Sequence, residues 1–170
     1  RLYSPTPGNA EALADELSQA SWCPEIRVVA DPDEAVRTAD IIWTATTSLT
    51  PTFSAASVAP GTHIVGIGSF QPSMVEIEPS ILNKGIVFVD QMEASWSEAG
   101  EMIAARSQGL LDFEEVTELG EIVLGLHPGR ANDHEITVFK SVGIAAQDAM
   151  ASSIALDAAE IHGLGTTVQL

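Results

Sequence analysis

A hydroxyl-rich turn follows one of the apolar runs of this sequence, and its side chains are suited to bind a sugar or an amide. The run begins at Ile41, and Ile41-Ile42-Trp43 has the composition of a buried strand. In an open α/β sheet, ligands bind at the carboxyl ends of the strands. A cofactor's ribose and nicotinamide would be hydrogen-bonded here, although Ser/Thr-rich loops are also common without a ligand. The residues of this turn are Thr44, Ala45, Thr46, Thr47 and Ser48.

Two glycine-containing turns occupy the same position after later apolar runs. The first follows His63–Ile67, and the second follows Ile136–Phe139. Their glycines permit close approach of the backbone to a ligand, but ordinary turns would have the same composition. The residues are Ile67, Gly68, Ser69 and Phe70 in the first turn, and Ser141, Val142 and Gly143 in the second.

The N-terminal residues indicate where the adenosine half of a dinucleotide would bind. Arg1 to Ser4 have the pattern of a strand end, and a helix is predicted to begin with Thr6 as its N-cap and Pro7 as its first residue. In a dinucleotide fold, an acidic side chain at this strand end usually holds the ribose of NAD. Ser4, Pro5 and Thr6 offer hydroxyls and a helix N-terminus instead, which favours a 2′-phosphate and hence NADP. The alternative is that they only form the turn and cap the helix.

Predicted strands and helices alternate along the chain. Continuous apolar runs, typical of a sheet covered on both faces, predict strands at 41–43, 63–67, 86–89 and 136–139, with shorter β-rich runs at 1–4 and 26–30. Helices are predicted after Thr6, after the capping pattern at Asp31, and at about 92–105, 114–124 and 144–161, the last ended by Gly163. This order predicts an α/β fold with a doubly wound, mainly parallel sheet and helices on both faces.

Composition argues against several classes of protein. Seven Lys and Arg residues against 24 Asp and Glu give a net charge of −17, so no positive field attracts a nucleic acid or an anionic membrane. No apolar run reaches the roughly 18 residues that cross a bilayer, so a soluble protein is expected. Cys23 is the single cysteine, which precludes an internal disulfide and fits a reducing cytoplasm. No two of the four histidines have metal-ligand spacing, so no metal site is expected.

The chain contains neither a GxGxxG nor a GxxxxGK[ST] pattern. A dinucleotide-binding domain needs a glycine loop for the pyrophosphate, so we expect that loop and the first strand to lie upstream of Arg1. The sequence also begins without methionine, on what reads as a strand end. We therefore expect a fragment of a longer protein that has no activity and weak or absent cofactor affinity by itself.

Taken together, these motifs resemble the ornithine cyclodeaminase/mu-crystallin family over nearly the whole chain. The family is a Rossmann domain inserted into a separate N-terminal substrate and dimerisation domain. The resemblance implies a partial NAD(P)-binding domain at 1–150, and at 151–170 a helix end and strand that return towards the substrate domain. The segments that carry it are Ala39–Thr46, Pro60–Ile64 with Ile67-Gly68, Glu118–Ile122, and Ile136–Gly143 with Gln147-Asp148.

The resemblance also implies roles for the three kinds of turn. Ser4, Pro5 and Thr6 match the adenosine-ribose loop, and Thr46 with its neighbours matches the nicotinamide-ribose side. Ile67 to Ser69 match the wall under the nicotinamide, and Ser141 and Val142 match the edge shared by cofactor and substrate. The family's substrate-holding lysine and arginine fall outside this sequence.

Two positions depart from the cyclodeaminase pattern. Phe70 stands where cyclodeaminases carry a catalytic aspartate, and Met74 stands where they carry a lysine near the cofactor. No catalytic residue is therefore assigned within the chain. Ring-closing deamination needs a carboxylate to move protons between amines. Reduction of a cyclic imine takes a hydride from NAD(P)H and a proton from a donor that we expect upstream of this sequence. It asks of this loop only an apolar wall that excludes water, which Phe70 suits.

The sequence thus predicts an NAD(P)H-dependent reductase or dehydrogenase of cyclic imino or amino acids, such as pyrroline-2-carboxylate or a ketimine. The alternatives are an ornithine cyclodeaminase, which releases proline and ammonia, and a mu-crystallin-like NADPH-dependent binding protein that need not turn over. The expected cofactor is NADP or NAD, with NADP favoured. The expected partners are a small amino or imino acid and a second subunit, in a cytoplasmic homodimer built through the other domain.

Overall fold

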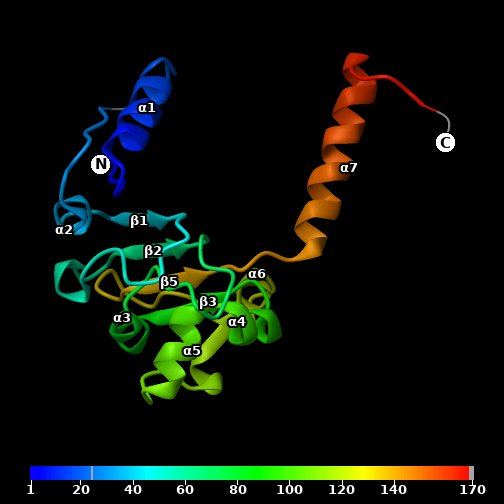
Figure 1. The fold of residues 1–170 in the computed structure, drawn as a ribbon. Helices are drawn as coiled ribbons and strands as arrows, with labels where there is room; N and C mark the ends of the chain where they lie inside the picture. The colour runs from blue at the N-terminus through cyan, green and yellow to red at the C-terminus, as the bar shows by residue number, and fades with distance from the viewer. Residues whose placement is uncertain (24, 169–170) are drawn as a thin grey trace.

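The computed structural model describes residues 1–23 and 25–168, and a five-stranded sheet forms the centre of the molecule (Figure 1). Each neighbouring pair of strands is parallel, in the order β1-β2-β5-β3-β4. The predicted α/β class with a mainly parallel sheet is therefore confirmed. The strands are β1 (Ile41–Thr44), β2 (His63–Gly66), β3 (Ile86–Val89), β4 (Val116–Glu118) and β5 (Thr137–Lys140).

The three middle strands form the apolar centre of the fold. Ile64 of β2, Val87 and Val89 of β3, and Val138 of β5 have no exposed surface. β-Branched side chains of this kind pack well on a pleated surface that is covered from both sides. The continuous apolar runs that predicted these strands thus reflect burial on two faces.

Two of the predicted helix starts are found as expected. α1 (Pro7–Ser18) begins after Thr6 with proline in its first turn, and α2 (Pro32–Val36) begins after Asp31, whose carboxylate accepts a hydrogen bond from the Asp33 N–H at 3.0 Å. Figure 1 shows these two helices on the β1 side of the sheet, and α3, α4 and α5 on the β3–β4 side. The remaining helices are α3 (Pro79–Lys84), α4 (Met92–Glu98), α5 (Gly100–Ser107), α6 (Leu119–Val123) and α7 (Ala145–His162), with 3-10 turns η1 (Ala55–Ser57) and η2 (Phe113–Glu115).

The prediction of one helix at about 114–124 is wrong, because its middle forms strand β4. Val116 pairs with Val87 of β3, and Glu118 pairs with Val89. An unpaired edge of β3 offers backbone hydrogen bonds and an apolar contact that local helix propensity does not match. Only α6, which follows β4 directly, remains helical.

The helix predicted at about 92–105 is interrupted at Ala99, which has extended backbone angles (φ −78°, ψ 104°) between α4 and α5. The next residue, Gly100, packs directly against another loop. A Cβ atom on Gly100 would lie 2.1 Å from the Met74 carbonyl oxygen and 2.7 Å from that of Pro72. The glycine therefore allows the 72–74 loop to approach the start of α5.

The N-terminal part of the chain is attached more loosely than the sequence predicts. The runs at 1–4 and 26–30 meet only in an isolated parallel bridge between Leu2 and Val28. On the neighbouring edge strand β1, Ile41 is 64% exposed and Trp43 is 67% exposed, while Ile42 is buried. Strand β1 is thus covered on one face only, contrary to the expectation for its continuous apolar run.

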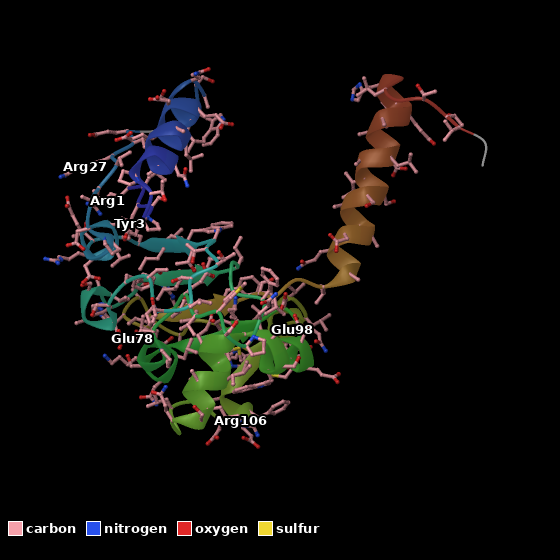
Figure 2. All side chains as sticks on the ribbon, viewed as in Figure 1. Arg1, Tyr3, Arg27, Glu78, Glu98 and Arg106 are labelled. Atoms are coloured by element: carbon pink, nitrogen blue, oxygen red, sulfur yellow. The ribbon has the colours of Figure 1, made fainter. Side chains whose placement is uncertain are left out.

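Helix α7 extends away from the rest of the molecule (Figure 1), and its side chains project on all sides (Figure 2). None of its residues is buried, although Met150, Ile154, Leu156 and Ile161 are large and apolar. Gly163 ends the helix in the left-handed conformation at φ 63°, as predicted. The predicted boundary between residues 150 and 151 falls inside α7, and residues 163–168 form no strand; residues 169–170 lie outside the described part of the chain.

Within residues 1–23 and 25–168, no helix combines the length and the apolar character that a membrane span requires.

Candidate functional site

The loops that follow β1, β2 and β5 meet at one edge of the sheet, because these strands are parallel and in register. Thr44 lies beside Gly66, and Gly66 lies beside Lys140. The backbone continues this contact past the strand ends: the Ile67 N–H donates to the Thr44 carbonyl and the Ser141 N–H donates to the Gly66 carbonyl, both at 3.0 Å. The predicted turns at 44–48, 67–70 and 141–143 are therefore brought together.

A buried carboxylate joins the first two of these turns. Glu76 has no exposed surface, and its side chain accepts hydrogen bonds from three backbone N–H groups. Gly68 donates at 2.7 Å and Ser69 at 3.0 Å, both to Oε2, while Thr46 donates to Oε1. A carboxylate is the side-chain group that can accept several such bonds at once, because it has only acceptors. Glu76 thus links the loop after β1 to the loop after β2.

Gly68 is required by the closeness of these two loops. A Cβ atom at this position would lie 2.1 Å from the Thr46 nitrogen, 2.2 Å from the Thr46 carbonyl oxygen and 2.5 Å from Oε1 of Glu76. Two of these contacts are with backbone, which cannot rotate away. The sequence predicts that Gly68 lets the backbone approach a ligand closely; in the structure the nearest atoms at this position are the Thr46 backbone and Glu76.

Beneath the same turns lies a second buried group, which contains Lys140, Glu101 and Ser69. The Lys140 ammonium donates to the carbonyl oxygens of Ser69 at 2.7 Å, Ser141 at 3.0 Å and Gly66 at 3.2 Å. It also lies 3.6 Å from Oε1 of Glu101, and neither side chain of this ion pair is exposed. The Ser69 hydroxyl lies 2.8 and 2.7 Å from the two oxygens of Glu101 and can donate to either.

Burial and attraction act in opposite directions on this ion pair. Burial raises the pKa of Glu101, and the nearby Lys140 and the Ser69 hydroxyl oppose that rise. Burial likewise lowers the pKa of Lys140, and the charges of Glu101, Glu76 and Asp90 oppose that fall. Burial is the larger influence on the pKa of both groups, and the charge of each partner reduces the shift of the other, since a buried ion is expensive without a partner.

A third carboxylate connects β3 to the loop after β5. Asp90 directly follows β3, and its Oδ2 accepts from the Ser141 hydroxyl at 2.6 Å and from the Gly143 N–H at 2.9 Å. Gly143 has φ 87°, a left-handed conformation that favours glycine, and no heavy atom other than those of its chain neighbours lies within 4 Å of where its Cβ would be. Asp90 thus fixes the loop at 141–143, and the position of a Cβ on Gly143 faces open space.

The individual side chains of the predicted site differ in exposure. Ile67 is 40% exposed and Phe70 is 47% exposed, so both present apolar surface beside the hydroxyl-rich turn. Thr44 and Ser69 are buried, and Val142 packs against the core. The remaining members of the three turns are half-buried (Thr46, Ser48, Gly68), exposed (Ala45, Thr47, Gly143) or just buried (Ser141, 9%).

Ser4, Pro5 and Thr6 are not joined to this group. Within the described residues, the hydrogen bonds of this segment are local: Ser4 Oγ accepts from the Thr6 N–H at 3.2 Å, and the Thr6 carbonyl accepts from the Asn9 N–H at 2.9 Å. Thr6 precedes α1 but makes no side-chain capping bond. The Ser4 hydroxyl therefore forms a local turn at the start of α1, which is the alternative role of this segment.

Four residues that organise this edge were not among the predicted site residues: Glu76, Asp90, Glu101 and Lys140. Asp90 and Lys140 each directly follow an apolar run. A charged residue at the end of a predicted strand can be recognised from the sequence as a candidate site residue. Glu76 stands between Val75 and Ile77, and Glu101 stands between Gly100 and Met102, but neither belongs to a predicted turn at a strand end. Only the fold reveals that they are buried.

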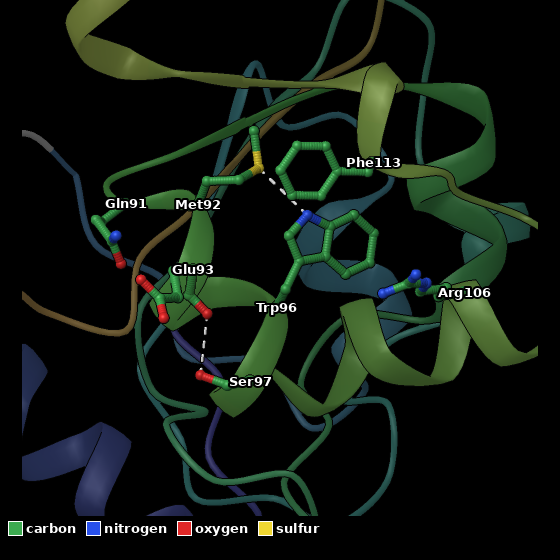
Figure 3. A pocket seen from close by; sticks show the side chains of 7 residues that line it. All are labelled: Gln91, Met92, Glu93, Trp96, Ser97, Arg106 and Phe113. Carbon is green, nitrogen blue, oxygen red and sulfur yellow. Dashed lines mark hydrogen bonds between the residues drawn. The ribbon is translucent and has the colours of Figure 1, made fainter.

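A separate hollow of about 490 Å³ lies along α4 and α5 (Figure 3). Trp96 stacks on Phe113 with 6.2 Å between ring centroids, and the Arg106 guanidinium lies 5.5 Å from the Trp96 ring. The Trp96 N–H donates to the Met92 sulfur at 3.2 Å. The aromatic rings, the guanidinium and the sulfur thus interact with one another, and none of the predicted site residues lines the hollow.

Comparison with known proteins identifies the family. The family model for the ornithine cyclodeaminase/mu-crystallin family matches residues 1–162. The chain is 38% identical over 170 residues to Delta(1)-pyrroline-2-carboxylate reductase of Bacillus cereus, covering 99% of this chain and 52% of that protein. It is 34% identical over 157 residues to the ketimine reductase mu-crystallin of Macropus fuliginosus, covering 92% of this chain and 46% of the relative. The chain belongs to the ornithine cyclodeaminase/mu-crystallin family.

A solved structure agrees with this assignment. The Delta(1)-pyrroline-2-carboxylate reductase of Thermococcus litoralis, in complex with NADH and L-proline, has a TM-score of 0.93 to this chain at 36% identity. The match covers 98% of this chain and 51% of that one. The chain thus has the Rossmann-like fold of its family and spans about half the length of the relatives it matches.

Proposed function

We propose that the protein that carries this chain is an NAD(P)H-dependent reductase of cyclic imino acids, with pyrroline-2-carboxylate or a related ketimine as substrate. The observation that carries the proposal is the edge where the loops after β1, β2 and β5 meet. There, the exposed apolar residues Ile67 and Phe70 belong to the loop after β2, which Glu76 joins to the hydroxyl-rich 44–48 turn. The named activities of the Bacillus and Thermococcus relatives support the same substrate class.

The residues present fit a nicotinamide nucleotide. Open space borders Gly143, and the neighbouring Ser141 hydroxyl is oriented by Asp90. Half-buried Thr46 and exposed Thr47 offer hydroxyls for a ribose, and Ile67 offers an apolar face for a flat ring. When bound, the cofactor supplies a hydride for the carbon of the imine. The chain's own residues bind and orient that cofactor and exclude water from the reacting face.

Phe70 favours reduction over ring-closing deamination. Its ring is 47% exposed at the edge, where a carboxylate would be needed to move protons between amines. Glu76 and Glu101, which contact the preceding residue Ser69, are completely buried. Asp90 follows β3, and one of its oxygens already accepts hydrogen bonds from Ser141 and Gly143. An apolar group at this position can shield a cyclic imine from water but cannot exchange protons with ornithine.

The proposal is tested by steady-state assay of the protein that contains residues 1–170. We expect oxidation of NADH or NADPH in the presence of pyrroline-2-carboxylate, with formation of proline. Ornithine should give no ammonia under the same conditions. Ammonia release from ornithine without net NADH formation would instead identify a cyclodeaminase, and cofactor binding without either reaction would identify a binding protein.

We further propose NADP as the preferred cofactor, a homodimeric assembly and a cytoplasmic location. The NADP preference is supported by the lack of Asp or Glu at positions 4–6 and in the first turn of α1. The second is supported by the exposed apolar side chains of α7, which suit a partner surface. The single cysteine supports the third. Titration with NADPH and NADH, together with sedimentation of the whole protein, tests the first two.

A further inference from the structure

We propose that Glu76 is a positioning residue: its buried carboxylate holds the loops after β1 and β2 in the relative placement that nicotinamide nucleotide binding requires. The inference deepens the proposed function and rests on it for the identity of the ligand. Glu76 itself has no exposed surface and cannot touch a ligand at the edge. Its effect must therefore pass through the residues it contacts.

The contacts of Glu76 span the two loops and little else. The N–H groups of Gly68 and Ser69 donate to Oε2, and the N–H of Thr46 donates to Oε1. Thr46 is 30 residues away in sequence, so its contact is a long-range one. Since each oxygen is bound to a different loop, rotation of the carboxylate would break contacts to both. One side chain thus sets the separation between the hydroxyl turn and the turn with Ile67.

The backbone of Glu76 strengthens the same link. Its carbonyl oxygen accepts from the Thr52 N–H and hydroxyl, both at 2.9 Å, and the preceding residue Val75 donates its N–H to the Ser48 carbonyl at 2.8 Å. The 48–52 segment, which continues the loop after β1, is therefore hydrogen-bonded to the backbone of Val75 and Glu76. Glu76 is therefore fixed through its backbone as well as through its carboxylate oxygens.

The Lys140 charge compensates Glu76 without sharing its contacts. Lys140 and Glu76 attract each other, but the ammonium hydrogens go to carbonyl oxygens of Gly66, Ser69 and Ser141. The three N–H groups at Glu76 therefore depend on this carboxylate alone. A glutamine at this position has one acceptor oxygen and one NH2 group. The NH2 group would face at least one backbone N–H, and because two donors repel each other the two loops would move apart.

The test uses Glu76→Gln, with Glu76→Asp as a charge-conserving variant and Glu78→Gln as the matched control. Glu78 is two residues away and also accepts a backbone N–H, that of Ala55 at 2.8 Å, but this bond lies at η1, remote from the edge. Glu78 is labelled in Figure 2. Each variant is made in the protein that contains residues 1–170.

Two measurements are made on each variant. In the cofactor-free protein, amide hydrogen exchange at Thr46, Gly68 and Ser69 is expected to accelerate at least about tenfold in Glu76→Gln relative to Val87 and Val138, because a charge-assisted bond is lost. The Kd for NADH, from quenching of tryptophan fluorescence, is expected to rise at least about tenfold, with a smaller change in kcat at saturating cofactor. Glu76→Asp should recover part of both effects, and Glu78→Gln should show neither.

The outcomes separate this proposal from the proposed function. If the wild-type protein binds NADH and Glu76→Gln binds it equally well, the positioning role is overturned while the function stands. Uniformly faster exchange, or a loss of affinity that Glu78→Gln shares, would reduce Glu76 to a general stabilising residue and also overturn it. If the wild-type protein binds no nicotinamide nucleotide, the proposed function fails, and the exchange pattern alone then decides whether Glu76 fixes the loops. Should Glu76→Gln fail to fold, Glu76→Asp carries the same comparison.

Discussion

The two ends of the parallel sheet hold their loops by different means. At the carboxyl end, Glu76, Glu101 and Lys140 are completely buried, and each contacts backbone or side chains of the loops after β1, β2 and β5. At the amino end, Arg130 is exposed and joins the Gly61 carbonyl to the Thr137 hydroxyl, with bonds of 2.8 and 2.9 Å. The carboxyl end depends on buried charges, whereas the contacts described at the amino end come from a surface cation, neutral side chains and backbone.

This difference indicates which end carries function. Burying a charge is unfavourable unless partners compensate it, so a fold that needed only to join its strands could use surface contacts at both ends. The carboxyl end instead confines the placement of several loops within a small space, next to the surface formed by Ile67 and Phe70. The amino end connects strands without buried ions. The comparison predicts that mutations at the carboxyl end lower the free energy of unfolding more than mutations at the amino end do.

The largest effect is expected for Lys140→Met. This change leaves Glu101 and Glu76 buried without their cation, so the free energy of unfolding should fall by about 3–5 kcal/mol. Urea unfolding followed by circular dichroism measures it, with Lys84→Met at the exposed end of α3 as the control. The double variant Lys140→Met/Glu101→Leu should be more stable than Lys140→Met alone. If the free energy of unfolding falls by less than about 1 kcal/mol, the Lys140 ion pair contributes no more than an exposed salt bridge.

Gly68→Ala is expected to have the second largest effect, because the new Cβ would overlap the Thr46 backbone. Overpacking of this kind destabilises by about 1–3 kcal/mol. The matched control is Gly8→Ala in α1, where a Cβ meets no atom within 4 Å and removal of a helical glycine should stabilise by up to about 1 kcal/mol. Thermal unfolding compares the two, and equal shifts would contradict the tight approach of the loops.

At the amino end, Arg130→Ala should lower the free energy of unfolding by about 0.5–1.5 kcal/mol, the usual net contribution of a hydrogen bond. The Gly61 carbonyl and the Thr137 hydroxyl lose a donor, but water can replace the guanidinium at this exposed position. The same urea titration that is used for Lys140→Met gives the value. A destabilisation as large as that of Lys140→Met would erase the proposed contrast between the two ends.

The smallest effect is a dependence of stability on pH that arises from His63. Burial, followed by the nearby Arg130, lowers the pKa of His63, whose Nδ1 lies 2.7 Å from the Thr137 hydroxyl. The unfolded chain, with a His pKa of about 6.5, therefore binds a proton more readily than the folded one. The resulting stabilisation is complete above that pKa and is lost as the pH falls through the folded value. His63→Gln should flatten the stability profile below neutral pH; an unchanged slope would exclude this source.

Several features could be predicted from the sequence because they depend on neighbours along the chain. Pro7 and Asp31 mark helix starts through local backbone geometry and capping, and Gly163 marks a helix end through its left-handed conformation. Apolar runs predicted β1, β2, β3 and β5, since short segments rich in β-branched and apolar residues favour strands. The turns at the strand ends followed from these strands, because parallel strands bring their carboxyl ends to one edge.

Other features depend on partners far away in sequence. Val116 lies in a strand because β3 offers it an edge, and its own residues had favoured a helix. The helix break at Ala99 coincides with the close packing of Gly100 against the loop at Met74. Glu76 looks like a surface acid until the fold brings the N–H groups of Thr46, Gly68 and Ser69 around it.

The sequence alone determined the α/β class, the positions of four strands and the candidate turns, because burial of apolar runs and local capping act at short range. The tertiary structure alone decided which charges are buried and which loops they join. A charged residue is placed inside a protein only where donors or opposite charges from other segments compensate the loss of water. That compensation arises when the strands pair, so Glu76, Glu101 and Lys140 acquire their roles only in the folded chain.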